Sequence, residues 1–180
     1  RNTDVVGVER SLRRAGLSSA EHAVLVGAGA TARSVVVALD ALGVRGITVA
    51  VRDAARAGGI RTLAEELGLE FDAVALGDLA AVVEETDVVA WTLPNGVPLD
   101  EQLPVSAREH AVALDVTYHP WPGPLAAQWL AVGGRVASGR DMLLHQAVRQ
   151  VRLFVSGQTE VPLEAEATVE AAMASALVKD

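Results

Sequence analysis

The glycine-rich segment over residues 24–33 combines residue types and a spacing that suit phosphate binding. An apolar run ends at Gly27, and the sequence then predicts a helix. Gly27 allows a tight turn, and Gly29 lets a phosphate approach the N–H groups at the helix start. Ala32 stands where the third small residue of a G-x-G-x-x-G/A fingerprint packs helix against strand. The alternative is a strand–helix turn without a ligand. The residues expected to contact a dinucleotide here are Gly27, Ala28, Gly29, Ala30 and Thr31.

A charged segment follows the next apolar run and reads Val51-Arg52-Asp53-Ala54-Ala55-Arg56. It contains the residue types that select NAD as well as those that select NADP. An acidic residue at this place binds the ribose hydroxyls of NAD, whereas arginine accommodates the 2′-phosphate of NADP. If Arg52 begins a helix, Arg52 and Arg56 share one face and could clamp a phosphate. Asp53 either contacts the cofactor or caps that helix, and an exposed cluster that only solvates the helix start also fits. Because two cations outnumber one carboxylate, we favour NADP.

The elements that must position these residues alternate along the chain. Strands are predicted over residues 22–26, 47–51, 71–75, 87–92, 111–116 and 135–137. Helices are predicted over residues 4–15, 30–42, 54–67, 78–85, 124–132, 141–155 and 163–177. This order indicates an α/β fold: a Rossmann-like, doubly wound parallel sheet with helices on both faces and right-handed crossovers. Ligands bind at the carboxyl ends of the strands in such sheets, where the glycine turn, Thr92 and Tyr118 are expected.

Composition narrows the classes of protein that fit. The chain has 180 residues, a formal charge of −8 and no cysteine, and 51% of it is hydrophobic but only 3% aromatic. The negative charge argues against a nucleic-acid partner, and no apolar run reaches the roughly 18 residues of a membrane span. The lack of cysteine excludes disulfides and fits a cytoplasmic protein. No two histidines have metal-ligand spacing, so no metal is expected.

Motifs in the second half of the chain resemble those of shikimate dehydrogenases. Residues 114–122, Leu-Asp-Val-Thr-Tyr-His-Pro-Trp-Pro, resemble the D-V-x-Y-N-P-x-x-T segment of that family. Residues 139–147, Gly-Arg-Asp-Met-Leu-Leu-His-Gln-Ala, resemble its G-x-x-M-L-x-x-Q-A helix start. Asn2-Thr3-Asp4 matches the N-T-D that precedes the helix joining its two lobes. With the glycine turn and the Arg52/Arg56 pair, the resemblance extends from residue 2 to about residue 178.

The chain also departs from the family pattern. The usual N-R-T reads Val51-Arg52-Asp53, the N-A-T-P/S-x-G-M loop reads differently over residues 90–97, and the asparagine before Pro120 is His119. The lobe that carries the family's catalytic lysine precedes N-T-D, whereas the only lysine here is Lys179. We therefore expect a fragment or trimmed chain without its substrate lobe. Residues 1–18 would form the inter-lobe helix, and residues 19–180 the NADP-binding domain with C-terminal helices.

The resemblance implies a role for individual residues. Asp4 would be catalytic, pairing with the lysine of the missing lobe and bonding a substrate hydroxyl, and Asn2, Thr3, Tyr118 and Gln146 would also bind substrate. Gly139 and Met142 would lie near the nicotinamide, with Thr92 and Leu93 bordering the cofactor. Simpler interpretations remain open: helix capping for Asp4, core filling for Met142, an interior amide for Gln146 and a rim position for Tyr118.

The activity implied by the resemblance is the reversible reduction of 3-dehydroshikimate to shikimate with NADPH, in aromatic amino acid biosynthesis. The expected partners are this small-molecule substrate and the missing lobe, without which the chain should turn over poorly. The oligomeric state is not indicated by the sequence. Two alternatives stay open. One is a dehydrogenase of quinate or an aminoshikimate, which Asp53 allows to use NAD; the other is a non-catalytic NADP-binding module.

Overall fold

The computed structural model describes residues 2–177, so Lys179 lies outside the described residues. The helices are α1 (Thr3–Arg14), α2 (Ala30–Ala41), α3 (Gly58–Leu67), α4 (Leu79–Val82), α5 (Val105–His110), α6 (Pro124–Leu130), α7 (Gly139–Ser156) and α8 (Glu166–Leu177). Two short 3-10 helices are η1 (Ala54–Ala57) and η2 (Leu76–Asp78). The strands are β1 (His22–Val26), β2 (Gly46–Val51), β3 (Glu70–Ala75), β4 (Val88–Trp91), β5 (Val112–Asp115) and β6 (Arg135–Ser138).

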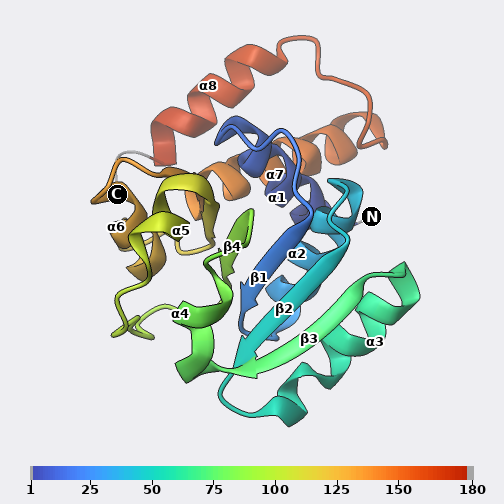
Figure 1. The fold of residues 1–180 in the computed structure, drawn as a ribbon. Helices are drawn as coiled ribbons and strands as arrows, with labels where there is room; N and C mark the ends of the chain where they lie inside the picture. The colour runs from blue at the N-terminus through green and yellow to red at the C-terminus, as the bar shows by residue number, and fades with distance from the viewer. Residues whose placement is uncertain (1, 178–180) are drawn as a thin grey trace.

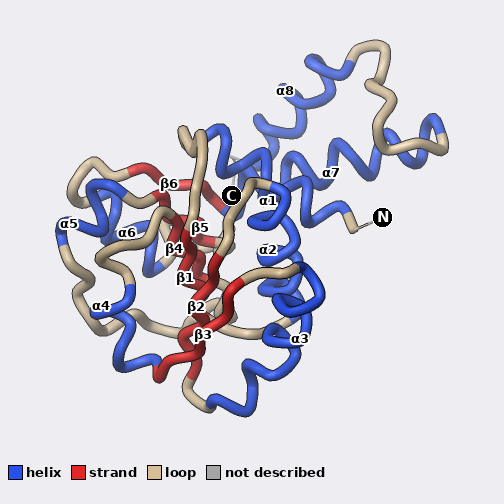
Figure 2. The backbone as a smooth tube through the Cα atoms, turned by 45° about the vertical axis from the view of Figure 1, so that its right-hand side comes forward, coloured by secondary structure: helices blue, strands red, loops and turns tan. Residues whose placement is uncertain are grey.

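The strands form one parallel sheet in the order β3-β2-β1-β4-β5-β6. Figure 1 labels β1 to β4, and Figure 2 labels all six strands. At the carboxyl edge, Val26 of β1 lies level with Ala50 of β2 and with Trp91 of β4. The chain therefore winds outward from β1 in one direction and from β4 in the other. The predicted doubly wound parallel sheet is confirmed, and β1 and β4 flank the point where such folds bind ligands.

Helices cover both faces of the sheet, with α1, α2, α3 and α7 on one side and α4, α5 and α6 on the other (Figure 2). On the first face, Val35 and Leu39 of α2 are fully buried against strand residues such as Leu25. On the second face, Trp91 and Trp129 fill the core. Because both faces are covered, the central strands consist mainly of apolar residues, as is typical of buried parallel strands.

The helices differ from the prediction in several places, and α8 begins at Glu166 instead of residue 163. The predicted helix over residues 54–67 is divided into η1 and α3, because Asp53 caps a 3-10 turn that ends at Gly58, where α3 begins. The helix predicted over residues 78–85 is shorter, and α5 was not predicted. Helix α7 begins at Gly139, two residues earlier than predicted, because Ser138 caps it: the Ser138 hydroxyl accepts a 3.0 Å bond from the Asp141 N–H.

Helix α1 packs closely on α7 through a glycine. A Cβ on Gly7 would lie 2.6 Å from the Met142 carbonyl oxygen, so only glycine permits this approach of the two backbones. Val8 and Leu12 on the same helix are fully buried. The helix carrying the N-T-D motif is thereby fixed against the helix that carries Met142 and Gln146.

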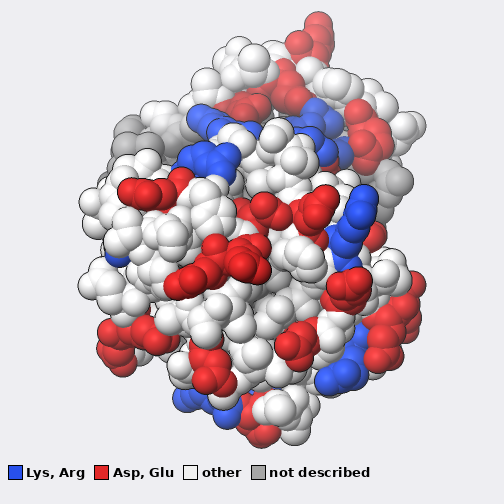
Figure 3. Space-filling model, in the orientation of Figure 1, with Lys and Arg blue, Asp and Glu red and all other residues white. Residues whose placement is uncertain are grey.

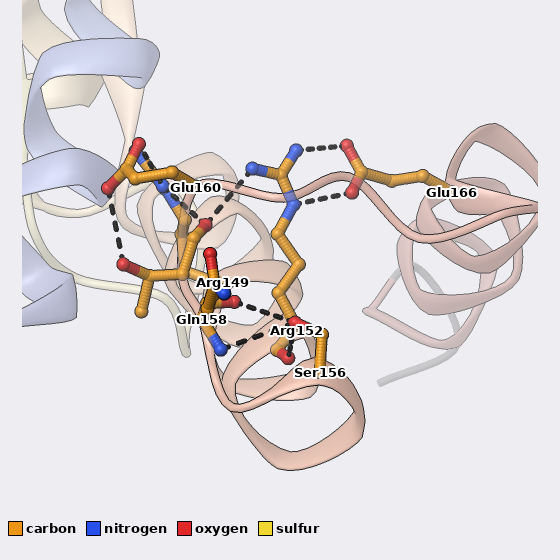
Figure 4. A network of polar contacts seen from close by, with 7 residues as sticks. Arg149, Arg152, Ser156, Gln158, Glu160 and Glu166 are labelled. Atoms are coloured by element: carbon orange, nitrogen blue, oxygen red, sulfur yellow. Dashed lines mark hydrogen bonds and ion pairs between the residues drawn. The ribbon is translucent and has the colours of Figure 1, made fainter.

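Helix α8 is held to α7 by polar contacts rather than by a buried face. None of its residues is buried, whereas the Arg152 guanidinium on α7 is 5% exposed and bonds both carboxylate oxygens of Glu166 (Figure 4). Next to this pair, Arg149 lies 2.7 Å from Glu160 in the segment between the two helices. At the end of α7, Phe154 is 85% exposed and Val155 is exposed as well.

The chain has more acidic than basic side chains, 23 Asp and Glu against 15 Lys and Arg. Asp and Glu side chains are scattered over the face seen in Figure 3, with arginines in smaller groups between them. In the described part of the chain, no helix combines the length and the apolar character that crossing a membrane requires.

Candidate functional site

A cleft of about 890 Å³ opens at the carboxyl edge of the sheet. It is bounded by the ends of β1, β2, β4 and β5 and by the starts of α2 and α7. The predicted site residues that line it are Asp4, Gly27, Ala28, Gly29, Ala30, Thr31, Arg52, Arg56, Thr92, Leu93, Tyr118, Gly139, Met142 and Gln146. The structure thus brings together, in one cavity, residues from most of the length of the chain.

The glycine turn forms the floor of the cleft. Gly27 has a φ of +102°, and a Cβ there would lie 2.9 Å from the Thr92 hydroxyl and 3.0 Å from the Leu93 side chain. Gly29 precedes α2 in an extended conformation, and nothing lies within 4 Å of the place where its Cβ would be. Gly27 is therefore required by the fold, whereas Gly29 leaves open space in front of the helix start, as a phosphate site needs.

Arg52 and Arg56 both line the cleft. They do not share a helix face, because the condition for that, a helix that begins at Arg52, is not met. Helix η1 begins at Ala54 because the Asp53 carboxylate caps it, accepting a 3.0 Å bond from the Ala55 N–H. Arg52 remains outside the helix. Within residues 2–177, neither guanidinium has an ion-pair or hydrogen-bond partner, whereas Asp53 is absent from the cleft lining. Two free cations and no neighbouring carboxylate face this end of the cleft.

Helix α7 presents one face to the cleft. Met142 and Gln146 lie one turn apart and both line it, as their spacing predicted. Gly139, at the start of α7, allows a close approach to the preceding loop, since a Cβ there would lie 2.3 Å from the Val116 carbonyl oxygen. Met142 is buried and belongs to the core, so core filling is confirmed, whereas its place beside the nicotinamide stays a prediction. The Gln146 amide is half-buried and has no hydrogen-bond partner among the described residues.

The loop that carries Tyr118 is fixed at several points. The buried Asp115 carboxylate accepts bonds from the N–H groups of Thr117 (3.1 Å) and Ala126 (3.0 Å). Arg140 of α7 donates to the Tyr118 carbonyl oxygen at 3.0 Å. Asn95, from the loop after β4, donates to the next carbonyl, that of His119, at 2.8 Å. The Tyr118 side chain is 53% exposed, which places it at the rim of the cleft.

The N-T-D motif divides between two sites. Asn2 caps α1 through a 3.0 Å bond from the Asp4 N–H, and its amide donates to the Ser34 hydroxyl at 2.7 Å. The Thr3 hydroxyl accepts a bond from Gln150. Asn2 and Thr3 line a separate groove of about 400 Å³ instead of the main cleft. Asp4 alone of the three lines the cleft, and the capping considered for Asp4 is performed by Asn2.

Some residues of the cleft were not singled out from the sequence. They are Ala50, Val51, Leu76, Pro94, Asn95, Val97, Val116 and Leu143. A sequence signal was available for three of them, because Ala50, Val51 and Val116 end or follow strands at the ligand-binding edge. Asn95 precedes Gly96 in a turn, and its contact with His119 depends on a pairing of loops that the sequence does not specify.

One titratable residue next to the cleft is perturbed. His145 precedes Gln146 on α7 and is buried, with Nδ1 lying 3.8 Å from a carboxylate oxygen of Glu170 on α8. Burial lowers the pKa of His145, and the Glu170 carboxylate opposes this effect in part. Across residues 2–177, no three His, Asp or Glu side chains come together as metal ligands would.

The chain resembles proteins of one known family both in sequence and in fold. The model of the shikimate / quinate 5-dehydrogenase family matches residues 9–105. The shikimate dehydrogenase (NADP(+)) of Nitrobacter hamburgensis is 35% identical over 176 residues, covering 94% of this chain and 60% of that protein. The structure of Mycobacterium tuberculosis shikimate dehydrogenase aligns with a TM-score of 0.80 at 36% identity, over 99% of this chain and 63% of that one.

The quinate dehydrogenase of Corynebacterium glutamicum, solved in complex with NAD, also aligns with a TM-score of 0.80, at 27% identity, over 100% of this chain and 63% of that one. The chain thus spans about three fifths of the length of these relatives. The family model covers residues 9–105. Sequence similarity to the relatives covers 94% of the chain and so includes the cleft residues of α7. The chain belongs to the shikimate / quinate 5-dehydrogenase family.

Proposed function

We propose that the cleft binds NADP(H) and that this chain is the nucleotide-binding part of an enzyme that interconverts 3-dehydroshikimate and shikimate. The observation that carries the proposal is the joining of three features in one cavity: the open glycine turn, the free Arg52 and Arg56, and the unpaired polar groups of Asp4 and Gln146. The relatives named for NADP and for shikimate support it.

The residues present fit the cofactor. The turn at Gly29 and the start of α2 would hold the pyrophosphate, and Arg52 and Arg56 would hold the 2′-phosphate. Gly139 and Met142 would flank the nicotinamide. When bound, the cofactor supplies or accepts the hydride.

The chain's own polar groups would orient the substrate. Asp4 is the one carboxylate among the described lining residues, and with Gln146 it would bond the hydroxyl groups of a small acid. Reduction of a ketone also needs a proton donor at its oxygen. Asp4 would hold the ammonium of a lysine there and keep it charged, but no lysine lies among residues 2–177.

A lysine-bearing lobe is therefore the proposed partner, and residues 1–18 are the proposed inter-lobe segment. Without that lobe we expect the rate of shikimate oxidation to be lower by about 10²–10⁴-fold, the usual contribution of general acid–base catalysis. The assay is NADP⁺ reduction with shikimate by this chain alone. Turnover typical of a complete enzyme would contradict the proposed partner, though not NADP binding. A cytoplasmic location stays a prediction.

The test of the cofactor is calorimetric titration with NADP⁺ and, separately, with NAD⁺. We expect NADP⁺ to bind at least tenfold more tightly, a difference of about 1.4 kcal/mol. Arg56→Ala should remove most of this preference by weakening NADP⁺ alone. Arg45→Ala is the matched control, because Arg45 is exposed and lies outside the cleft lining. An equal loss in both variants would show that net charge, and not a clamp, attracts NADP⁺.

The second candidate is a quinate-type activity with NAD. The similarity to a quinate dehydrogenase in complex with NAD favours it. Tighter binding of NAD⁺ than of NADP⁺ by this chain would favour this candidate over the first. A chain that binds NADP⁺ but, joined to a lysine-bearing lobe, oxidises neither shikimate nor quinate would instead be a non-catalytic binding module.

A further inference from the structure

Arg56 lies on a short segment that is fixed at both of its ends. At the first end, Asp53 is extended and its carboxylate accepts a 3.0 Å bond from the Ala55 N–H, which starts η1. At the far end, Arg33 of α2 donates through Nη1 to the Gly59 carbonyl oxygen at 2.8 Å. The segment between these two points carries Arg56 to the cleft.

The direction of the Asp53 carboxylate matters for cofactor choice. An acidic residue at the end of the second strand of this fold usually bonds the ribose hydroxyls and selects NAD. Here the carboxylate bonds the backbone of its own helix and is not part of the cleft lining, although Arg52 and Arg56, on either side of it, are.

We propose that Asp53 and Arg33 are positioning residues that present Arg56 to the 2′-phosphate of NADP, and that Asp53 does not select NAD. This inference rests on the proposed NADP site. Helix η1 has four residues, of which only Ala57 is buried, so the Asp53 cap is the contact that orders its exposed first turn. Loss of the cap would let Arg56 sample many positions, so that binding a phosphate would first require ordering the segment.

The charge and the cap of Asp53 can be separated by substitution. Asp53→Ser removes the charge but keeps a side chain that caps about as well, whereas Asp53→Ala removes both. Asp72→Ser is the matched control: Asp72 is an exposed acid on the neighbouring strand, also bonded to a local N–H, and lies outside the cleft lining. Asp53 and Arg33 are exposed, so these variants should fold normally.

The experiment is calorimetric titration of each variant with NADP⁺ and with NAD⁺. We expect Asp53→Ala to weaken NADP⁺ binding about fivefold, the usual worth of a cap. Arg33→Ala should weaken NADP⁺ binding in the same direction, and both variants should leave NAD⁺ binding unchanged. The affinities of Asp53→Ser and Asp72→Ser for NADP⁺ and for NAD⁺ should stay within about twofold of those of the wild-type chain. Amide exchange at Ala55–Ala57 should speed up in Asp53→Ala but not in Asp53→Ser.

Three outcomes would overturn the inference. A tenfold gain in NADP⁺ affinity on Asp53→Ser would mean that the carboxylate repels the 2′-phosphate. A loss of NAD⁺ affinity in both Asp53 variants would mean that it bonds the ribose. An unchanged preference in Asp53→Ala and Arg33→Ala would mean that the segment needs neither anchor. If the wild-type chain binds neither dinucleotide, the proposed function fails first and this inference with it.

Discussion

The Thr92 hydroxyl donates a 2.8 Å hydrogen bond to the Val26 carbonyl oxygen, which also accepts the Thr92 N–H at 2.9 Å. This double contact joins the ends of β4 and β1 immediately before the glycine turn. Gly27 then fits against Thr92 with no room for a side chain. The hydroxyl proton of Thr92 is engaged within the fold, so a nucleotide in the cleft would meet only its lone pairs and its methyl group.

Gly27→Ala should destabilise the protein. The φ of +102° is unfavourable for alanine by about 1–2 kcal/mol, and the new methyl would press on Thr92 and Leu93. We expect a fall in Tm of about 2–4 °C for each kcal/mol lost, measured by thermal denaturation followed by circular dichroism.

Gly29→Ala separates folding from binding. The backbone there suits any residue and the added methyl would meet open space, so the Tm should stay close to that of the wild-type chain. NADP⁺ binding should nevertheless weaken strongly, because the methyl would occupy the space in front of the helix start. If Gly29→Ala binds normally, the phosphates lie elsewhere; if it destabilises as Gly27→Ala does, the turn has a different shape.

Asp115→Asn should loosen the loop that carries Tyr118. The buried carboxylate accepts bonds from two N–H groups, and an amide has only one oxygen for them. Leaving one buried donor without a partner costs about 1–3 kcal/mol. Urea denaturation should show this loss, with faster amide exchange at Thr117 or Ala126. Asp100→Asn, at an exposed position, is the control that should leave both unchanged.

Glu166→Gln should release α8 without unfolding the sheet. The Arg152 guanidinium holds the pKa of Glu166 below its ordinary value of 4.5. In the acidic range the native state therefore binds fewer protons than the unfolded chain. The contribution of the Arg152–Glu166 ion pair to the free energy of unfolding is present above about pH 4.5 and is lost as the pH falls through the lower native pKa. At neutral pH the variant should be cleaved faster by proteases over residues 157–165. Glu164→Gln, an exposed neighbour, is the control; equal cleavage in both variants would mean that α8 is held by other contacts.

His145 should make the protein less stable in mild acid. Burial lowers its pKa from the ordinary 6.5, with Arg10 and Arg14 of α1 acting in the same direction and Glu170 and Asp141 opposing. Below pH 6.5 the unfolded chain therefore takes up a proton that the native state does not, and stability falls toward the lower native pKa. His145→Gln should reduce the pH dependence of the free energy of unfolding, measured by urea denaturation between pH 7.5 and 5.5. His22→Gln, at an exposed site, should retain it.

The sequence predicted the sheet well because its signal is local. β1 has the predicted bounds, residues 22–26, and ends with its apolar run at Val26, and the glycines after the helices mark the helix ends. Helix α5 was missed because six residues with two buried positions show no periodicity, although Pro104 before it was an available start signal. The division at Gly58 was missed because the apolar spacing continues across it, while the cap at Asp53 decides where the turns begin.

The site was less predictable where it depends on competition between neighbouring groups. Spacing alone placed Met142 and Gln146 on one face, and the structure agrees. A shared helix face for Arg52 and Arg56 required Arg52 to start the helix. The helical turns instead begin at Ala54, where the predicted helix over residues 54–67 began, and Asp53 caps them, which was the alternative left open for it. Asn2, Thr3 and Asp4 are consecutive, yet successive helical residues point about 100° apart, so only Asp4 reaches the cleft.

Both cations of the cleft are arginines, and this gives the protein a practical property. Acylating reagents modify lysine amines readily but leave guanidinium groups intact. The only lysine of the chain is Lys179, so lysine-directed dyes, biotin or resin linkers have no target among residues 2–177. The protein can therefore be immobilised or labelled through lysine while Arg52 and Arg56 keep their chemistry, which makes it a convenient starting point for a dinucleotide sensor.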